Sequence, residues 1–206
     1  MDTRMLAEDP FLLMRMDERT VEDFEEDIAQ FTEKEFYWGI ALRYDLGQLG
    51  MPCKIEEHGV DNTGELIRGR LPNHNADKIY HFMDRRSPKK VEIKTIPEWC
   101  KNFFTFKVSA LKGCHAQGAY ILVPRSECYY LLGKKAFVHL LKNLRVRTDI
   151  ETFGLKPCVR PEMDMIEQMT DDGIITRREW KPKAREYVIR MSDILFKERK
   201  TTVGAR

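Results

Sequence analysis

The chain has 206 residues, of which 42% are hydrophobic and 33% are charged, and its formal net charge is +2. This length supports one sizeable hydrophobic core with a small appendage. The sequence holds no run of 18 apolar residues, and Met1 is followed by mixed charge rather than by a signal peptide. These features argue against a membrane or secreted protein, and we expect a soluble protein in the cytoplasm.

The charge is distributed unevenly along the chain. Residues 1–36 carry 12 acidic and 4 basic side chains, a net charge of −8, so the remaining residues carry +10. A basic body is typical of proteins that bind polyanions, although charge alone does not identify the partner.

The cysteines argue against a disulfide framework or a structural zinc site, because their number is odd and no Cys-x-x-Cys pair occurs. They fit a reducing compartment, and we expect them to be packing thiols. They are Cys53, Cys100, Cys114, Cys128 and Cys158.

The amino-terminal residues are predicted to be helical. Asp9 followed by Pro10 is typical of a helix start, and Phe11–Met16 is an apolar cluster that must pack on the body or on a second subunit. A second cap-like pattern at Thr20–Asp23 predicts a further, acidic helix. Residues 1–31 are therefore predicted to be an acidic helical arm.

A capping-box pattern at Thr32–Glu35 predicts a separate buried helix that begins there and runs to about Leu49. Strands are predicted at Cys53–Glu57 and Glu65–Leu71.

Beyond residue 100, hydrophobic periodicity and turn residues predict alternating helices and strands, with the weakest pattern between Arg145 and Val159. These elements are a helix at Val108–Gln117, strands at Gly118–Pro124 and Tyr129–Leu132, helices at Lys134–Leu144 and from Pro161 to about Asp171, strands at Ile174–Trp180 and Tyr187–Arg190, and a last helix at Ser192–Arg199.

The most informative stretch is a predicted β-hairpin from Ala76 to Ile96. Alternation along its second strand places Glu92 and Lys94 on one face and Val91 on the other. Asp77 opens the first strand, where the hairpin brings it beside Glu92. Two carboxylates and an ammonium on an otherwise apolar hairpin are costly to bury unless they pair with one another or bind a metal.

This charge cluster matches the chemistry of phosphodiester hydrolysis. A divalent metal held by carboxylates activates water and stabilises charge on phosphoryl oxygens, and an adjacent lysine orients or deprotonates the attacking water. Magnesium prefers oxygen ligands and keeps several waters. Asp77, Glu92 and the backbone carbonyl of Ile93 meet that requirement, with Lys94 beside the water.

The sequence Ala76-Asp77, followed after a gap of 14 residues by Glu92-Ile93-Lys94, resembles the active-site motif of the PD-(D/E)XK nuclease superfamily. That superfamily includes restriction endonucleases, Holliday-junction resolvases and repair nucleases. The resemblance covers Glu35–Val123, and Ala76 stands where the family name has proline. It implies that Asp77 and Glu92 bind Mg²⁺ or Mn²⁺ and that Lys94 is the catalytic lysine.

The resemblance also implies an α/β fold with a restriction-endonuclease-like αβββαβ core, in which helices flank a mixed central sheet. Residues 32–145 would form this nuclease-like core. Residues 146–206 would form a basic α+β extension packed on it.

Two further residues are candidates with open alternatives. Many members of the superfamily place a glutamate on the first core helix facing the metal, so Glu35 is a candidate for an additional metal ligand. Reciprocal capping of Thr32 explains the same residue equally well. Lys107 is a candidate contact to the scissile strand, or else a surface lysine at a helix start.

Other polar residues near the hairpin have weaker support. Asp61 is an alternative to Asp77 as the first carboxylate, but it lies in a loop where turn-forming aspartate is common. His74 is interpreted as a loop residue, and His81 as a structural histidine on the same strand face as Asp77.

A basic stretch near the carboxyl terminus, residues 177–200, has nine basic and four acidic side chains, with Trp180 and Tyr187 among them. Such aromatics can stack on bases while the charges neutralise phosphates. A solubilising segment with ordinary core aromatics is the alternative. The candidate nucleic-acid contacts are Arg177, Arg178, Lys181, Lys183 and Arg185.

The sequence thus predicts a divalent-metal-dependent nuclease that hydrolyses phosphodiester bonds, with DNA as the expected substrate. An RNA-directed nuclease and a non-catalytic nucleic-acid-binding or assembly module on the same fold stay open, and Phe11–Met16 leaves open a homodimer. The fingerprints of P-loop, dinucleotide-binding and serine-hydrolase proteins do not occur in the sequence.

Overall fold

The computed structural model describes residues 14–16, 21–58, 70–72, 76–96, 102–149 and 156–190. The helix predicted at Ser192–Arg199 and most of the strand predicted at Glu65–Leu71 lie outside these residues.

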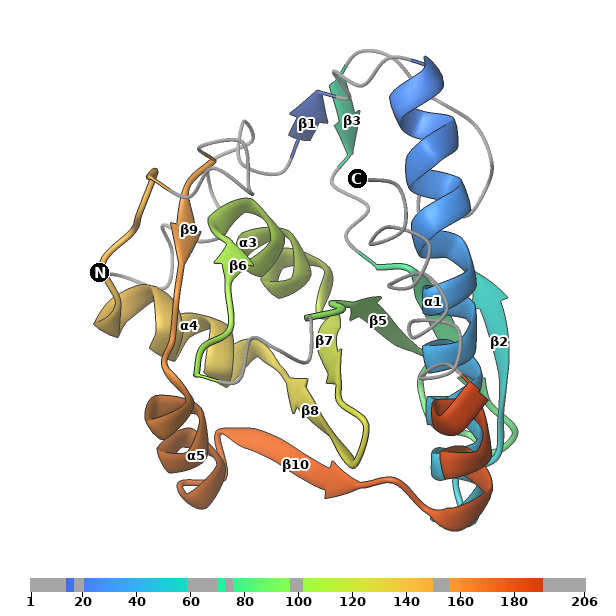
Figure 1. Cartoon of the computed structure of the whole chain (residues 1–206). Helices are drawn as coiled ribbons and strands as arrows, with labels where there is room; N and C mark the ends of the chain where they lie inside the picture. The colour runs from blue at the N-terminus through green and yellow to red at the C-terminus, as the bar shows by residue number, and fades with distance from the viewer. Residues whose placement is uncertain are drawn as a thin grey trace, which may run out of the picture.

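Among the described residues, six strands form a mixed central sheet in the order β10–β8–β7–β5–β4–β2 (Figure 1). β5 and β7 are parallel, because α3 (Val108–Gln117) connects them and returns the chain to the same end of the sheet. The other strand pairs of this sheet are antiparallel. The prediction of an α/β fold with a mixed central sheet is therefore confirmed. The strands are β2 (Cys53–Glu57), β4 (Lys78–Phe82), β5 (Lys89–Ile93), β7 (Tyr120–Pro124), β8 (Cys128–Leu132) and β10 (Ile175–Glu179).

Helices cover both faces of this sheet (Figure 1). On one face α1 (Val21–Gln48) and the helical residues 182–190 pack on a core that includes Trp38, Val91 and Ile93. On the other face α3, α4 (Lys134–Asn143) and α5 (Met163–Asp171) pack on strand side chains such as Ile121 and Val123. Alternate residues of the strands thus enter opposite cores.

The predicted hairpin is confirmed as β4 and β5, which pair antiparallel with Lys78 opposite Val91. Its turn is closed locally, because the Asp84 carboxylate accepts a hydrogen bond of 2.9 Å from the backbone N–H of Arg86. Asp77 directly precedes the Lys78–Val91 pair, which places it near Glu92.

The prediction of a separate helix start at Thr32 is wrong. One helix, α1, runs without interruption from Val21 to Gln48, so the predicted boundary between residues 31 and 32 falls inside it. Neither glycine nor proline occurs between Val21 and Trp38, so nothing ends the first helix before the capping-box pattern.

The prediction of a helix that includes residues 14–16 is also wrong. These residues form β1 (Met14–Met16), which pairs antiparallel with β3 (Arg70–Pro72) in a separate small sheet. Short apolar runs do not distinguish a strand from a helix by periodicity, and here a distant pairing partner decides the outcome.

The carboxy-terminal segment is part of the main fold. The strand predicted at Ile174–Trp180 is confirmed as β10, which the structure places at an edge of the central sheet. The strand predicted at Tyr187–Arg190 is wrong, because residues 182–190 are helical. Pro182 suits the first position of a helix, and the buried Ala184 and Val188 are spaced one helical turn apart.

Candidate functional site

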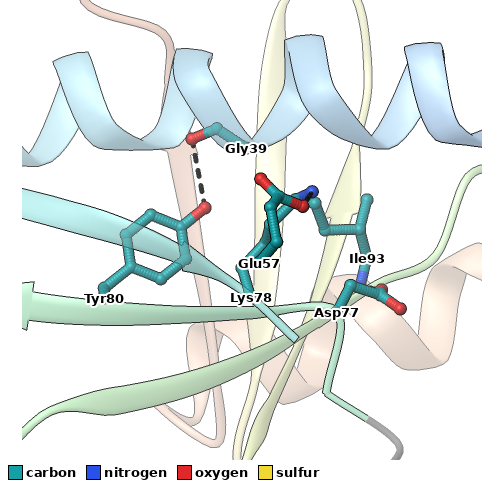
Figure 2. A network of polar contacts seen from close by, with 6 residues as sticks. All are labelled: Gly39, Glu57, Asp77, Lys78, Tyr80 and Ile93. Atoms are coloured by element: carbon teal, nitrogen blue, oxygen red, sulfur yellow. Dashed lines mark hydrogen bonds and ion pairs between the residues drawn. The ribbon is translucent and has the colours of Figure 1, made fainter. Parts of the chain in front are cut away.

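The start of β4 places the Asp77 carboxylate against the end of β5. The backbone N–H of Asp77 donates to the carbonyl of Val91 at 2.9 Å, so both Asp77 and Lys78 lie opposite Val91. The N–H of Ile93 then donates to Oδ2 of Asp77 at 2.5 Å, so the side chain takes the place of a backbone acceptor (Figure 2). Such a bond to a charged acceptor fixes the direction of the carboxylate.

The same geometry orients the carbonyl of Ile93. In an antiparallel pair the N–H and C=O of one residue point to the same neighbouring strand. Since the N–H of Ile93 points toward Asp77, its carbonyl also faces the β4 side of β5. Asp77 and the Ile93 carbonyl are therefore on the same side of the strand, as the predicted set of metal donors requires.

Glu92 and Lys94 lie on the face of β5 opposite Val91, as alternation predicts. Their side chains are 13% and 27% exposed, and the Lys94 ammonium is 3.7 Å from Oε1 of Glu92. The backbone of Lys94 is fixed by its N–H, which donates to the carbonyl of Leu122 in β7 at 2.8 Å. The structure thus brings Asp77, Glu92 and Lys94 together at the carboxyl end of β5.

Electrostatics connects Glu35 to this cluster. Burial tends to lower the pKa of Lys94, but the nearby carboxylates outweigh burial and raise it, with Glu92 the largest contributor and Asp77 next. The charge of Glu35 acts in the same direction. Glu35 therefore lies close enough to interact with the cluster from α1, where it precedes the buried Trp38 by three positions.

The capping interpretation of Glu35 is not compatible with this structure. Thr32 lies inside α1, so it has no role as the residue before a helix start. Of the two explanations that the sequence left open, interaction with the charge cluster is the one that agrees with the position of Glu35.

A buried lysine that the sequence reasoning missed lies next to the cluster. Lys78 is 1% exposed and forms an ion pair with Glu57 at the end of β2 (Figure 2). It lies beneath α1 where that helix has Gly39: a Cβ atom there would be 3.1 Å from Cε of Lys78. The Tyr80 hydroxyl donates to the Gly39 carbonyl at 3.1 Å. Only the β2–β4 register, which the sequence does not specify, places Glu57 opposite Lys78.

Two other neighbours of Asp77 were also missed. The N–H of His58 donates to the backbone carbonyl of Asp77 at 2.8 Å, which places His58 beside the cluster at the end of β2. Cys114 of α3 is fully buried, and burial, followed by the charges of Glu92 and Asp77, raises the pKa of its thiol. The thiol therefore stays protonated.

The predicted role of the cysteines as packing residues is confirmed where the structure describes them. Those described are buried and not in disulfides, and Cys100 lies outside the described residues. The described cysteines are Cys53, Cys114, Cys128 and Cys158.

The donors of the cluster fit a hard divalent cation. Asp77 and Glu92 supply carboxylate oxygens and Ile93 supplies a carbonyl oxygen, which are the ligands that Mg²⁺ and Mn²⁺ prefer alongside water. Within the described part of the chain, no three His, Cys, Asp or Glu side chains are grouped closely enough to hold a metal by themselves. A metal here would therefore depend on the backbone carbonyl, on waters, and on Glu35.

Lys107 lies at the end of β6 (Phe106–Lys107), directly before α3. β6 pairs with β9 (Cys158–Val159), and Lys107 is opposite Cys158. Burial raises the pKa of Cys158, while the charges of Lys107, Arg160 and Lys94 oppose that rise. The charges of Lys107 and Lys94 therefore both act on the same buried thiol.

The carboxy-terminal basic residues do not join the cluster. β7 and β8 separate β10 from β5, so Arg177 and Arg178 are about 14 Å away in the direction across the strands. Arg185 forms an ion pair of 2.5 Å with Glu127, and the Lys183 ammonium lies 4.8 Å from the centre of the Tyr44 ring.

The aromatic residues of this segment are structural. Trp180 is 5% exposed, stacks on Trp38 at 5.9 Å, and donates from Nε1 to the carbonyl of Arg125 at 2.8 Å. Tyr187 stacks on Tyr44 at 4.9 Å. The interpretation of both as ordinary packing aromatics is the one that the structure supports.

The remaining candidates are distant from the cluster or outside the described residues. His81 Nε2 is 2.7 Å from Glu56 on the exposed surface of β2 and β4, so it is a satisfied structural histidine. Asp61 and His74 lie outside the described residues.

Comparison of the chain with protein-family models, curated proteins and solved structures found no match. None of the helices in the described ranges combines the length and the hydrophobicity needed to cross a membrane.

Proposed function

We propose that this protein is a divalent-metal-dependent nuclease that hydrolyses phosphodiester bonds, with DNA as its substrate. The observation that carries the proposal is the convergence of Asp77, Glu92 and Lys94 at the end of β5, where the Ile93 N–H orients the Asp77 carboxylate. Placing two carboxylates and a lysine close together in a partly buried position costs folding free energy. Such groups are concentrated at functional sites, where their charges serve binding or catalysis.

The arrangement of the fold supports the same proposal. α1, β2, β4, β5, α3 and β7 follow one another as helix, three strands, helix and strand around the mixed sheet. This is the order of the restriction-endonuclease-like core, and the cluster lies at the β4–β5 hairpin, where that fold family carries its catalytic residues. β3 and β6, which lie between these elements in the chain, pair with β1 and β9 in separate small sheets and do not interrupt the order of the central one.

Asp77, Glu92 and the Ile93 carbonyl would hold Mg²⁺ or Mn²⁺, with Glu35 acting from α1 directly or through water. The bound metal would supply a water of lowered pKa and would offset the negative charge that develops on the phosphoryl oxygens. Glu92 also holds the Lys94 ammonium in place. Lys94 donates hydrogen bonds to the attacking water or to a phosphoryl oxygen.

The direct test is incubation of the protein with plasmid, single-stranded DNA and RNA in the presence of Mg²⁺ or Mn²⁺. Asp77→Asn, Glu92→Gln and Lys94→Met keep the side-chain shapes and remove the charges. Glu56→Gln is a matched control, because Glu56 is exposed and pairs with His81 away from the cluster.

We expect metal-dependent cleavage by the wild type and by Glu56→Gln, and a loss of at least about 100-fold in each of the three cluster variants. Cleavage that needs no metal, or that persists in Glu92→Gln, would contradict the proposal. Preferential cleavage of RNA would keep the mechanism and change the substrate. Nucleic-acid binding without cleavage in any metal would favour a non-catalytic module.

A further inference from the structure

The outer face of α4 is a basic surface that the sequence reasoning did not single out. The helix carries Lys134, Lys135 and Lys142 as exposed side chains, together with the half-buried His139. It contains no acidic residue, and neither do the residues after it up to Asp149. The opposite face, with Ala136, Phe137 and Leu140, is fully buried in the core.

Among the described residues, no carboxylate neutralises the charge of this surface by forming an ion pair with any of the three lysines. The neighbouring helix α3 adds no negative charge, since its sequence has no Asp or Glu. The three ammonium groups therefore concentrate positive potential along one side of the molecule.

The surface is open rather than enclosed. The side chains of α4 alone border a shallow depression of about 400 Å³, and they are Lys134, Lys135, Val138, His139, Lys142 and Asn143. Positive side chains around an open depression suit an extended anionic chain better than a small enclosed ligand.

From these observations we propose that the outer face of α4 binds the sugar–phosphate backbone of a nucleic acid, by charge and without reading the bases. Lys134 and Lys142 are about 12 Å apart along the helix axis, a length that spans three to four phosphates of one duplex strand. Lysine ammoniums bind phosphate as point charges and lack the fork geometry that reads guanine. The Asn143 amide donates to the His139 carbonyl, so it is engaged within the helix.

An anionic membrane is the less suitable partner. Helices that bind membranes at the interface insert an apolar face that carries residues such as Trp, Phe and Leu. The large apolar side chains of α4 face the protein core, and its outer face offers only the half-buried Val138.

The position of α4 suits a role in holding the substrate of the proposed nuclease, and in this respect the inference rests on that function. α4 packs beside α3 on the face of the sheet away from α1 (Figure 1). Val91 and Ile93 enter the core beneath α1, so the alternate side chains Glu92 and Lys94 point to the face of the sheet that α3 and α4 cover. After α4 the chain returns toward the site, since Arg147 bridges to Cys158, the partner of Lys107.

The test measures binding in EDTA, where a metal-dependent enzyme does not cut its substrate. Short fluorescein-labelled duplex DNA, single-stranded DNA and RNA are titrated with the full chain over a series of salt concentrations, and anisotropy is recorded. The variant is Lys134→Gln/Lys135→Gln/Lys142→Gln. The matched control, Lys54→Gln/Lys89→Gln/Lys90→Gln, removes the same charge from the β2–β4–β5 end of the sheet.

We expect the α4 variant to bind all sequences of a given nucleic acid more weakly and, on duplex DNA, to lose about 2.7 units of the salt slope. Between 50 and 200 mM salt, the affinity of the wild type would then fall roughly 40-fold more than that of the variant. The control is expected to keep the wild-type slope.

An unchanged slope in the α4 variant, or an equal loss in the control, overturns the inference, as does a wild type that binds no nucleic acid. If the α4 variant loses binding to phosphatidylserine vesicles but keeps its binding to nucleic acid, the inference is overturned in favour of a membrane partner. Metal-dependent cleavage that is unaffected in the α4 variant refutes the inference and leaves the proposed nuclease standing. Binding through α4 without cleavage in any metal supports the inference and refutes the proposed nuclease.

Discussion

Glu35→Gln separates the two explanations that the sequence left open for Glu35. The substitution removes one charge and keeps the shape of the side chain and its helix propensity. Because α1 is continuous through this position, there is no cap to lose, and we expect the free energy of unfolding without metal to change by less than about 0.5 kcal/mol. Loss of a helix cap would instead cost about 0.5–2 kcal/mol.

In the presence of metal the same substitution is expected to have a larger effect. Groups that support a metal site change its affinity by about 10- to 100-fold when removed. With the metal in excess, this change reduces the metal-induced stabilisation by about 1.4–2.7 kcal/mol. For a chain of this size, the rise in Tm on adding Mn²⁺ should then be smaller by about 3–10 °C.

The assay is thermal unfolding of the wild type, Glu35→Gln and Glu56→Gln over a series of Mn²⁺ concentrations. Glu56→Gln controls for the loss of one negative charge on the protein, since its partner is the exposed His81. A full Mn²⁺-dependent shift in Glu35→Gln, or a drop in its stability without metal as large as that of a lost cap, would refute the reasoning.

Three further predictions concern stability. Asp45→Ala should lower the free energy of unfolding by about 2–5 kcal/mol in denaturant titrations. Buried Asp45 accepts a hydrogen bond of 2.7 Å from the Tyr129 hydroxyl and a second from a backbone N–H, and the substitution removes both. Tyr129→Phe removes only the first bond, should lower the free energy of unfolding by about 1 kcal/mol, and serves as the partial control. Lys78→Met should leave the free energy of unfolding unchanged or raise it. Glu57→Ala leaves the buried Lys78 ammonium without its carboxylate and should lower the free energy of unfolding by about 3 kcal/mol. The opposite ranking of the two variants would contradict the assignment of this ion pair. Burial, and then the charge of a neighbouring lysine, lowers the pKa of His115. Since the folded state resists protonation here, stability should decline as the pH falls below about 6.5, and His115→Gln should make that decline shallower; an unchanged pH profile of Tm would argue against it.

Much of the fold and the proximity of Asp77, Glu92 and Lys94 were predictable, because they depend on sequence patterns within short stretches of the chain. Alternation of apolar and charged residues sets the faces of β5, and the Asp84 turn sets the hairpin, so the proximity of Asp77 and Glu92 follows from about twenty consecutive residues. The bounds of α3 and β2 likewise follow from turn residues and short-range patterns.

The errors arose where long-range contacts decide between local alternatives. Thr32–Glu35 is a valid capping pattern in isolation, but the residues before it are also helical, so the helix continues through the pattern. No local sequence rule decides between a new helix start and a continuing helix at this position. The ion pair between Lys78 and Glu57 depends on which strand pairs with β4. The basic face of α4 was overlooked because its pattern is that of any amphipathic helix.

The structure also changes how the carboxy-terminal basic residues must be tested. Truncation after Asp172 would remove a solubilising tail if the segment were one, but here it would delete an edge strand of the central sheet and the buried Trp180. It would also remove the Lys181 N–H that donates to Asp45 at 3.0 Å, and so loosen α1 at one end.

Loosening α1 at Asp45 would also affect the part of the helix that carries Glu35. Glu35 lies ten residues before Asp45, about 15 Å along one uninterrupted helix, so the carboxy-terminal contacts help to set where Glu35 stands relative to Lys94. A truncated protein that loses both nucleic-acid binding and cleavage would therefore reveal nothing about phosphate contacts. Arg177→Gln/Arg178→Gln, at exposed positions of β10, separates the two effects: reduced binding with an unchanged Tm assigns these arginines to the nucleic-acid surface, and unchanged binding removes them from it.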